Sequence, residues 1–309
     1  MGRISLRNTT YNLRRGWLLY VFLIPPLAYL IIFRYLPMYG IVIAFQDFIP
    51  NPQYGFFGDS PFVGFDNFVE IFSTDDFPNA LRNTLVLNVL DLLFSFPAPI
   101  ILALLLNELR VRWFKRVSQT LLYLPYFLSW AIIGGIVYQV FSIQHGVLNT
   151  AIKSLGLPAV PFLMEPVPWI GTYLAVGIWQ SAGWGTILYL AAIAGINMEL
   201  YDAAKVDGAG RVRSMWHITL PGIRPTIAIL LILSIGRVTT IPFDRPYILG
   251  NILVRDVADV ISTYVYRVGI QVGRYSIAAA VGLFQSLVGM ILVFISNFLT
   301  KKFWGQGIW

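Results

Sequence analysis

The sequence YDAAKVDGAGRVRSMWHITLP spans residues 201–221 and is rich in polar and charged residues, although the chain around it is strongly apolar. Of the 309 residues, 57% are hydrophobic and 12% are charged, about half the charged fraction of an ordinary soluble domain. This composition indicates a membrane protein. In such a protein, a polar run between two long apolar segments is a loop outside the bilayer.

Six apolar segments account for most of the chain, and most of them approach the length of about 20 residues that a helix needs to cross a bilayer. They are residues 17–33, 84–106, 121–141, 170–196, 226–241 and 277–299. We therefore predict an all-α membrane protein in which residues 1–309 form one transmembrane domain with six helices. The quoted run belongs to a loop of about residues 197–225, between the fourth and fifth helices.

The basic residues predict how these helices are oriented. Fourteen of the 22 Lys and Arg residues lie in residues 1–16, 107–116, 197–225 and 300–309. Because Lys and Arg are enriched on the cytoplasmic side of membranes, both terminal tails (1–16 and 300–309) and the quoted loop are expected in the cytoplasm. This topology also accounts for the formal net charge of +7. We expect contact with membrane lipid and no nucleic-acid partner.

The sequence lacks the residues of several kinds of active site. It has no cysteine and only two histidines, His145 and His217, so we expect no metal site. It also contains no GxxxxGK[ST] phosphate-binding loop, no HExxH motif and no GxSxG motif. We therefore expect a transport subunit without catalytic residues or a cofactor of its own. Energy for transport would come from a partner or from an ion gradient.

The polar loop itself is expected to form two short helical pieces on either side of a Gly-Ala-Gly break. Asp202 suits the cap or first turn of a helix, and Gly208 and Gly210 permit a sharp turn. The second piece, residues 211–219, mixes apolar and basic side chains and is suited to the membrane surface. These properties fit a docking element and an ordinary polar loop equally well.

The spacing within the loop resembles the EAA loop of bacterial ABC importer permeases. That pattern is EAA, a glycine three residues on, and then I-x-LP; this chain has Asp202 in place of the glutamate and keeps the other elements. The resemblance implies a cytoplasmic coupling helix that docks on a separate ATPase. The residues that it assigns to coupling are Asp202, Ala203, Ala204, Asp207, Gly208, Ile218, Leu220 and Pro221.

The resemblance also implies partners and a location. These are a second permease subunit, which we expect to be a different homologous chain, two cytoplasmic ATPase subunits that bind ATP and Mg, and an extracytoplasmic solute-binding protein. The location is the bacterial inner membrane. Further segments resemble permeases for complex oligosaccharides or polysaccharides, including alginate importers: PMYGIVIAFQDF (37–48), FDNFVEIF (65–72), LRNTLVLNV (81–89), DVISTYVYRVGI (259–270) and YSIAAAVGLFQSLVG (275–289).

Arginines in and near the apolar segments suggest the class of substrate. Arg237 lies about 18 Å beyond Pro225 along a helix, so it either lines the translocation pathway or extends to the outer interface. The guanidinium fork matches a carboxylate, which favours an acidic saccharide of the alginate or pectin type. The other arginines near outer segment ends are Arg34, Arg82, Arg245, Arg267 and Arg274.

Two alternatives remain open. A neutral oligosaccharide would suit the amides and aromatic residues Asn88, Trp179, Gln180, Tyr189 and Gln285. An ion-coupled secondary transporter would need titratable groups in the spans, and Asp91 is the one clear carboxylate there. Asp91 is either a pathway ligand or the partner of a neighbouring arginine.

Overall fold

The computed structural model describes residues 17–50 and 60–304. Within these ranges the chain is helical and forms no strand, although an isolated bridge joins Gln46 to Phe62. The prediction of an all-α protein is confirmed for this part of the chain. Three helices are long and apolar enough to cross a membrane, and three further bent pairs of helices meet the same test together.

The first part of the chain, through residue 154, forms a series of α, 3₁₀ and π helices. They are α2 (Trp17–Leu30), η1 (Ile31–Tyr35), η2 (Leu36–Phe45), α3 (Asp66–Ser73), α4 (Asp76–Leu90), η3 (Asp91–Ser95), α5 (Pro97–Glu108), α6 (Arg112–Tyr123), η4 (Leu124–Phe127), α7 (Trp130–Phe141) and α8 (Val147–Ser154).

The second half begins with a long helix and ends with another. Its helices are α9 (Pro166–Ala194), α10 (Met198–Val206), α11 (Arg211–Ser214), η5 (Met215–Thr219), α12 (Leu220–Gly222), α13 (Arg224–Gly236), α14 (Asp244–Leu249), η6 (Ile252–Val254), α15 (Arg255–Ala258), α16 (Ile261–Val265), η7 (Tyr266–Gln271) and α17 (Tyr275–Trp304).

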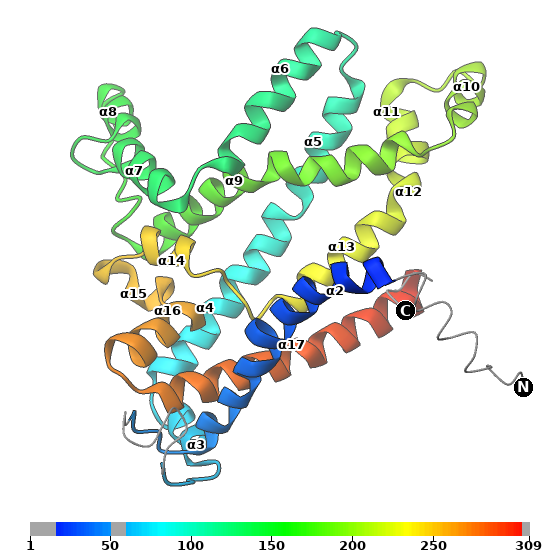
Figure 1. Ribbon diagram of the computed structural model, residues 1–309. Helices are drawn as coiled ribbons and strands as arrows, with labels where there is room; N and C mark the ends of the chain where they lie inside the picture. The colour runs from blue at the N-terminus through cyan, green and yellow to red at the C-terminus, as the bar shows by residue number, and fades with distance from the viewer. Residues whose placement is uncertain (1–16, 51–59, 305–309) are drawn as a thin grey trace, which may run out of the picture.

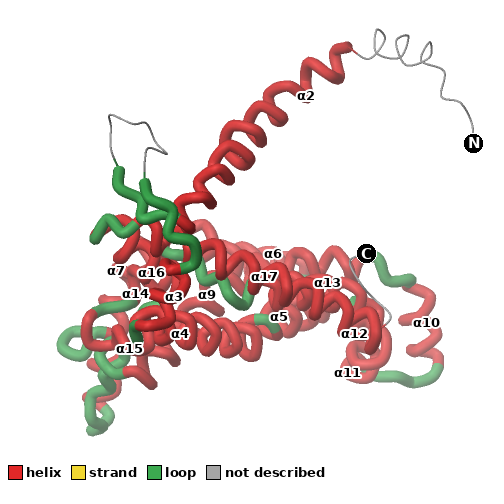
Figure 2. The backbone as a smooth tube through the Cα atoms, turned by 90° about the horizontal axis from the view of Figure 1, so that it is seen from below, coloured by secondary structure: helices red, strands yellow, loops and turns green. Residues whose placement is uncertain are grey.

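The first predicted span is longer than its sequence pattern suggested. The elements α2, η1 and η2 form one helical stretch of 29 residues, Trp17–Phe45. Figure 2 shows α2 standing clear of the other helices, and none of its residues is buried. Only its far end, η2, packs closely against α17. The apolar surface of α2 is therefore left for lipid or another subunit.

The second predicted span also begins earlier than expected. The stretch Asp76–Glu108 contains 33 residues and joins α4, η3 and α5. Its middle element, η3, is a π-helical turn that begins at Asp91. Turns of this kind interrupt the regular α-helical ladder and are frequent at functional sites.

The third predicted span, residues 121–141, is not one continuous helix. The helical stretches Arg112–Phe127 and Trp130–Phe141 meet at an angle of 105°. Pro125 lies at the start of η4, and Leu128 after it is extended. The α-helix α6 gives way to the 3₁₀ turn η4 at Pro125, which lacks an N–H for the α-helical hydrogen bonds, and the chain bends after this turn, at Leu128. Ser129 then caps α7 by accepting a hydrogen bond from the Ile132 N–H.

The ends of the last two predicted spans also differ from expectation. The fifth does not continue to residue 241, because α13 ends at Gly236 and Arg237 is its C-cap. The sixth continues past residue 299, since α17 extends to Trp304. Residues 300–304, expected in a terminal tail, are thus helical. The expected tail of residues 1–16 and the end of the other tail, residues 305–309, lie outside the described residues.

The long helices lie side by side, and different short elements gather at the two ends of the fold (Figure 1). One end carries α10, α11 and the C-terminus of α17, and we call it the α10 end. The opposite end carries α3, α14, α15 and α16, and we call it the α16 end. Two apolar clusters, around Trp169 and Phe77, fill the α16 end. A third, around Tyr189, joins α5, α9 and α13 towards the α10 end.

Candidate functional site

The helix α10 begins and ends with clear local signals. The Asn197 side chain accepts a hydrogen bond of 3.0 Å from the Glu199 N–H, so Asn197 is the N-cap. The prediction that Asp202 caps or begins this helix is wrong, because Asp202 lies within it and instead pairs with Lys205 at 2.8 Å. The preference for Asn, Asp, Ser or Thr at the N-cap holds here, but the capping residue is Asn197, which precedes the EAA-like motif.

Gly208 ends α10 in a conformation that favours glycine. Its φ is +74°. The Ala209 N–H donates to the Ala204 oxygen at 2.8 Å, and the Gly208 N–H donates to the Lys205 oxygen at 3.1 Å. This is the Schellman pattern, in which a left-handed residue closes a helix. Gly210 has φ −72°, so the expectation that the turn also requires glycine there is wrong.

The helix α10 projects from the body of the protein at the α10 end (Figure 1). No residue of α10 is buried. Asp202, Ala203, Asp207 and Gly208 are all exposed, and Ala204 is half-buried. The apolar side chains Met198, Leu200 and Val206 are exposed too. These side chains give α10 an apolar surface that the rest of the described chain leaves uncovered.

The end of the segment 201–221 connects α10 to the long helices of the fold. Ile218 and Leu220 are half-buried, and Leu220 packs against the Tyr189 cluster. Pro221 lies at the start of α12, where its missing N–H costs little. Tyr201 contributes a contact that the motif did not predict: its hydroxyl lies 2.9 Å from that of Thr219 on η5. This hydrogen bond connects α10 to η5, which leads directly into α12.

A cavity of about 280 Å³ brings together three of the predicted pathway residues, Asn88, Asp91 and Arg245. Arg245 on α14 donates from Nη1 to Asp91 Oδ2 at 2.8 Å. Its Nη2 donates to the Tyr173 carbonyl oxygen at 2.6 Å, and its guanidinium carbon lies 3.6 Å from the centre of the Tyr173 ring. Asp91 is therefore the partner of an arginine, one of the two roles left open above.

Two of the predicted amides contact backbone at the break after α13. Asn88 donates to the Val238 oxygen at 2.6 Å, and Gln285 on α17 donates to the Thr239 oxygen. Carbonyl groups released by a helix end need such donors, because few water molecules reach them inside a membrane. These side chains stabilise the break, and the break positions α14 and Arg245.

The remaining predicted pathway residues are not in the cavity. Gln180, also on α9, is not among the residues that line the cavity and makes a 3.5 Å contact with the Tyr126 oxygen. Arg34, in η1, and Arg237 are exposed elsewhere. Tyr189 is buried in the third cluster, so its ring does not reach a sugar in this conformation.

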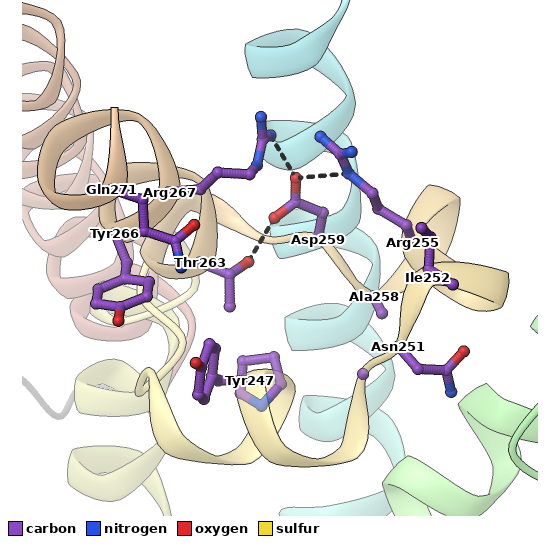
Figure 3. Close-up of a pocket in the computed structure, with 12 residues that line it drawn as sticks. Tyr247, Asn251, Ile252, Arg255, Ala258, Asp259, Thr263, Tyr266, Arg267 and Gln271 are labelled. Carbon is purple, nitrogen blue, oxygen red and sulfur yellow. Dashed lines mark hydrogen bonds and ion pairs between the residues drawn. The ribbon is translucent and has the colours of Figure 1, made fainter. Parts of the chain in front are cut away.

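The arginines at the α16 end are held by neighbouring carboxylates. Arg267 donates to Asp259 at 2.8 Å and to Asp76 at 3.1 Å. Figure 3 shows Arg255, Arg267 and Thr263 converging on Asp259 beside a pocket of about 270 Å³. Arg274 likewise donates to Glu70 at 2.7 Å. These ion pairs join the segments between the long helices.

No group of three or more His, Asp or Glu side chains within residues 17–50 and 60–304 is placed to hold a metal ion. What the fold does offer is a projecting helix at one end and a charged, partly closed cavity between its long helices. The first fits a protein partner, and the second fits a polar solute.

Comparisons with known proteins agree with this arrangement. The chain is 50% identical to the protein LplB of Bacillus subtilis (strain 168) over 297 residues, 96% of this chain and 92% of LplB. It is 45% identical to the polygalacturonan/rhamnogalacturonan transport system permease protein YteP of the same organism over 291 residues, 94% of this chain and 90% of YteP.

A solved structure is similar over almost its full length. It is a crystal structure of a bacterial ABC transporter involved in the import of the acidic polysaccharide alginate, with a TM-score of 0.88 and 40% identity, covering 96% of this chain and 99% of that one. The family model of the inner membrane component of binding-protein-dependent transport systems matches residues 95–305. The chain is therefore a member of that family of inner membrane transport components.

Proposed function

We propose that this chain is a permease subunit of an ATP-driven ABC importer that moves an oligosaccharide or polysaccharide into the cytoplasm. The observation that carries the proposal is the exposed helix α10, which Gly208 ends and which the Tyr201 hydroxyl links to η5. A subunit without a phosphate-binding loop of its own needs such a surface to receive work from an ATPase. The EAA-like residues of α10 provide it.

The full arrangement in the membrane is part of the proposal. In this proposal each of the three bent pairs forms one span, which together with the three long helices makes six. Both termini and α10 are then cytoplasmic, because the basic segments lie together on that side. The α16 end faces outward, towards the solute-binding protein on which this family depends. Two ATPase subunits hold ATP and Mg in the cytoplasm, and a second, homologous permease completes the pathway.

The substrate class that we propose is an acidic saccharide, alginate-like or pectin-derived. The similar solved transporter imports the acidic polysaccharide alginate, and YteP is named for polygalacturonan and rhamnogalacturonan. This chain adds a physical reason, since its central cavity contains Arg245. The pathway proposed from the sequence included Asn88, Asp91, Gln180, Gln285, Arg34, Arg237 and Arg245, and we now centre it on the cavity beside Asp91 and Arg245.

The proposed mechanism follows from the linkage between α10 and the long helices. Closure of the ATPase subunits moves α10, and the hydrogen bond to η5 passes this displacement to α12 and α13. The break after α13 and the π-helical turn at Asp91 are the points where these helices can change shape. A ligand alone cannot drive the cycle, because the two conformations must differ in their contacts with the ATPase.

The test is reconstitution of the complete importer in proteoliposomes, with its solute-binding protein outside and ATP inside. We expect ATP-dependent uptake of uronic acid oligosaccharides, with weaker uptake of neutral oligosaccharides of the same length. Stronger uptake of the neutral sugars would favour the neutral-saccharide alternative. Uptake that needs an ion gradient and proceeds without ATP would contradict the proposal in favour of a secondary transporter.

A further inference from the structure

Arg245 is held in the cavity by contacts from two separate elements, η3 and α9. Its guanidinium donates to Asp91 from both terminal nitrogens, at 2.8 and 3.3 Å, and to the Tyr173 carbonyl oxygen at 2.6 Å. A Cβ atom at Gly177 on α9 would overlap this guanidinium. The glycine therefore leaves the space through which Arg245 crosses α9 to reach Asp91.

The two members of this ion pair differ in the partners that each would keep if the pair separated. Asp91 also accepts a hydrogen bond of 2.8 Å from the Ser95 hydroxyl, so it keeps one donor if Arg245 leaves. Arg245 has only Asp91 as a carboxylate partner among the described residues, and its Nε is buried without a hydrogen-bond acceptor there. Because an unpaired charge inside a membrane protein is costly, Arg245 needs an anion at all times.

The pair also borders open space. The side chains of Arg245 and Asp91 are 13% and 23% exposed, and both line the cavity together with Asn88, Ser181 and Ser234. A saccharide in this cavity therefore meets hydroxyl and amide groups next to the ion pair. A carboxylate on that saccharide would present to Arg245 the same two oxygen acceptors that Asp91 presents.

We infer that Asp91 pairs with Arg245 when no substrate is bound, and that a carboxylate of the acidic saccharide replaces Asp91 as the partner of Arg245 during transport. This inference rests on the proposed function and adds a basis for its selectivity. Exchange of one carboxylate for another leaves Arg245 paired throughout, and Ser95 retains Asp91. A neutral sugar provides no such replacement, so Arg245 and Asp91 together select for carboxylated substrates.

The test uses the complete importer in proteoliposomes with two ligands of equal length, a uronic acid oligosaccharide and its carboxyl-reduced, neutral counterpart. Binding of each ligand to the solute-binding protein is measured separately, and uptake is compared at equal saturation of that protein. The key variant is Arg245→Gln. We expect its ratio of acidic to neutral uptake to fall tenfold or more, about the factor that one charge-assisted hydrogen bond provides.

Two further variants separate exchange from a structural role. Asp91→Asn leaves Arg245 without its anion. Free glucuronate can then enter the cavity and pair with Arg245, so we expect added glucuronate to inhibit uptake by this variant. The double variant Asp91→Asn/Arg245→Gln removes both charges with little change of shape, and it should import the neutral ligand at least as well as the wild type. Arg255→Gln, the same substitution outside the cavity, should leave the uptake ratio unchanged.

An equal loss of acidic and neutral uptake in Arg245→Gln and in the double variant would overturn the exchange and leave the pair as a structural brace. An unchanged ratio in Arg245→Gln would overturn it as well. Failure of the proposed function has a different signature, because the wild-type importer would then take up neither sugar in response to ATP. In that case the exchange would fall together with the function.

Discussion

The hydroxyl groups of Tyr201 on α10 and Thr219 on η5 lie 2.9 Å apart and share a hydrogen bond. Thr219 is buried, whereas the helix that carries Tyr201 has no buried residue. The bond therefore fixes an exposed helix to a buried point. It makes Tyr201 a positioning residue for the surface that we assign to ATPase docking.

Replacement of this hydroxyl should loosen α10 without unfolding the protein. We expect Tyr201→Phe to lower the free energy that holds α10 in place by about 1 kcal/mol, because the ring remains and one hydrogen bond is lost. Hydrogen–deuterium exchange of the α10 amides should become faster as a result. Tyr247→Phe, at an exposed tyrosine of α14, is the control. Unchanged α10 exchange in Tyr201→Phe would show that the bond does not hold the helix.

The packing of α9 against α6 should be sensitive to one glycine and indifferent to another. A Cβ atom at Gly183 would overlap the Leu122 carbonyl group, whereas a Cβ at Gly171, also on α9, meets no atom within 4 Å. Gly183→Ala should therefore destabilise the protein by about 1–3 kcal/mol through overpacking. Thermal unfolding in detergent measures this, and Gly171→Ala should match the wild type. Equal melting of the two variants would contradict the close approach of α6 and α9.

The break after α13 should depend on the Gln285 side chain. Gln285→Leu leaves the Thr239 carbonyl oxygen without its side-chain donor, and an unpaired buried polar group costs about 1–3 kcal/mol. We expect a corresponding fall in the detergent melting temperature. Ser286→Ala on the same helix is the control, because that exposed hydroxyl donates only to the Gly282 carbonyl of its own helix. A Gln285→Leu variant as stable as Ser286→Ala would contradict this role.

Acidic solution should weaken the connection between α3 and the start of α17. The pKa of Glu70 lies below 4.5, chiefly because Arg274 donates a hydrogen bond to its carboxylate, while partial burial acts in the opposite direction. A carboxyl group with a lower pKa in the folded state stabilises the fold above its unfolded pKa. That contribution is lost as the pH falls through the lowered folded value.

We therefore expect wild-type stability to fall more steeply than that of Glu70→Gln between about pH 5 and about pH 3. Arg274→Gln should follow Glu70→Gln, because either change removes the same pair. Melting temperatures across this range check the prediction. Parallel curves for all three proteins would mean that the pair contributes no pH dependence.

The sequence predicted the long elements better than their interruptions. Apolar length located α9 and α17 to within a few residues, because burial in a membrane requires little more than continuous apolar helix. It missed the 105° bend between η4 and α7, although Pro125 marked a break. Composition alone could not show that α13 ends at Gly236, since Asn88 and Gln285, distant in sequence, support that end.

The two candidate sites also differ in how far they could be predicted from the sequence. The candidate coupling loop could be proposed from the sequence because its residues are contiguous and their spacing reflects one local structure, the Schellman turn at Gly208. The cavity could not, because Asp91 and Arg245 are separated by 154 positions and meet only through the fold. The sequence did not single out Gly177, because this glycine acts only by leaving room for the Arg245 side chain.

We propose that ATP hydrolysis by a partner drives this chain through α10, and the glycines of the loop offer a matched test. A Cβ atom at either Gly208 or Gly210 meets no atom within 4 Å, but only Gly208 has a positive φ, +74°. A left-handed conformation costs a residue with a side chain about 1–2 kcal/mol, and a β-branched residue tolerates it poorly. Gly208→Val should therefore disrupt the end of α10, and Gly210→Val should not.

The decisive measurement is ATP hydrolysis by the reconstituted importer, with and without the sugar-loaded binding protein. We predict that Gly208→Val loses most of the stimulation by sugar and most of the uptake while the chain remains in the membrane. Gly210→Val should retain both to within about twofold, as expected of an exposed position without special conformation. Full stimulation and uptake in Gly208→Val would contradict the account.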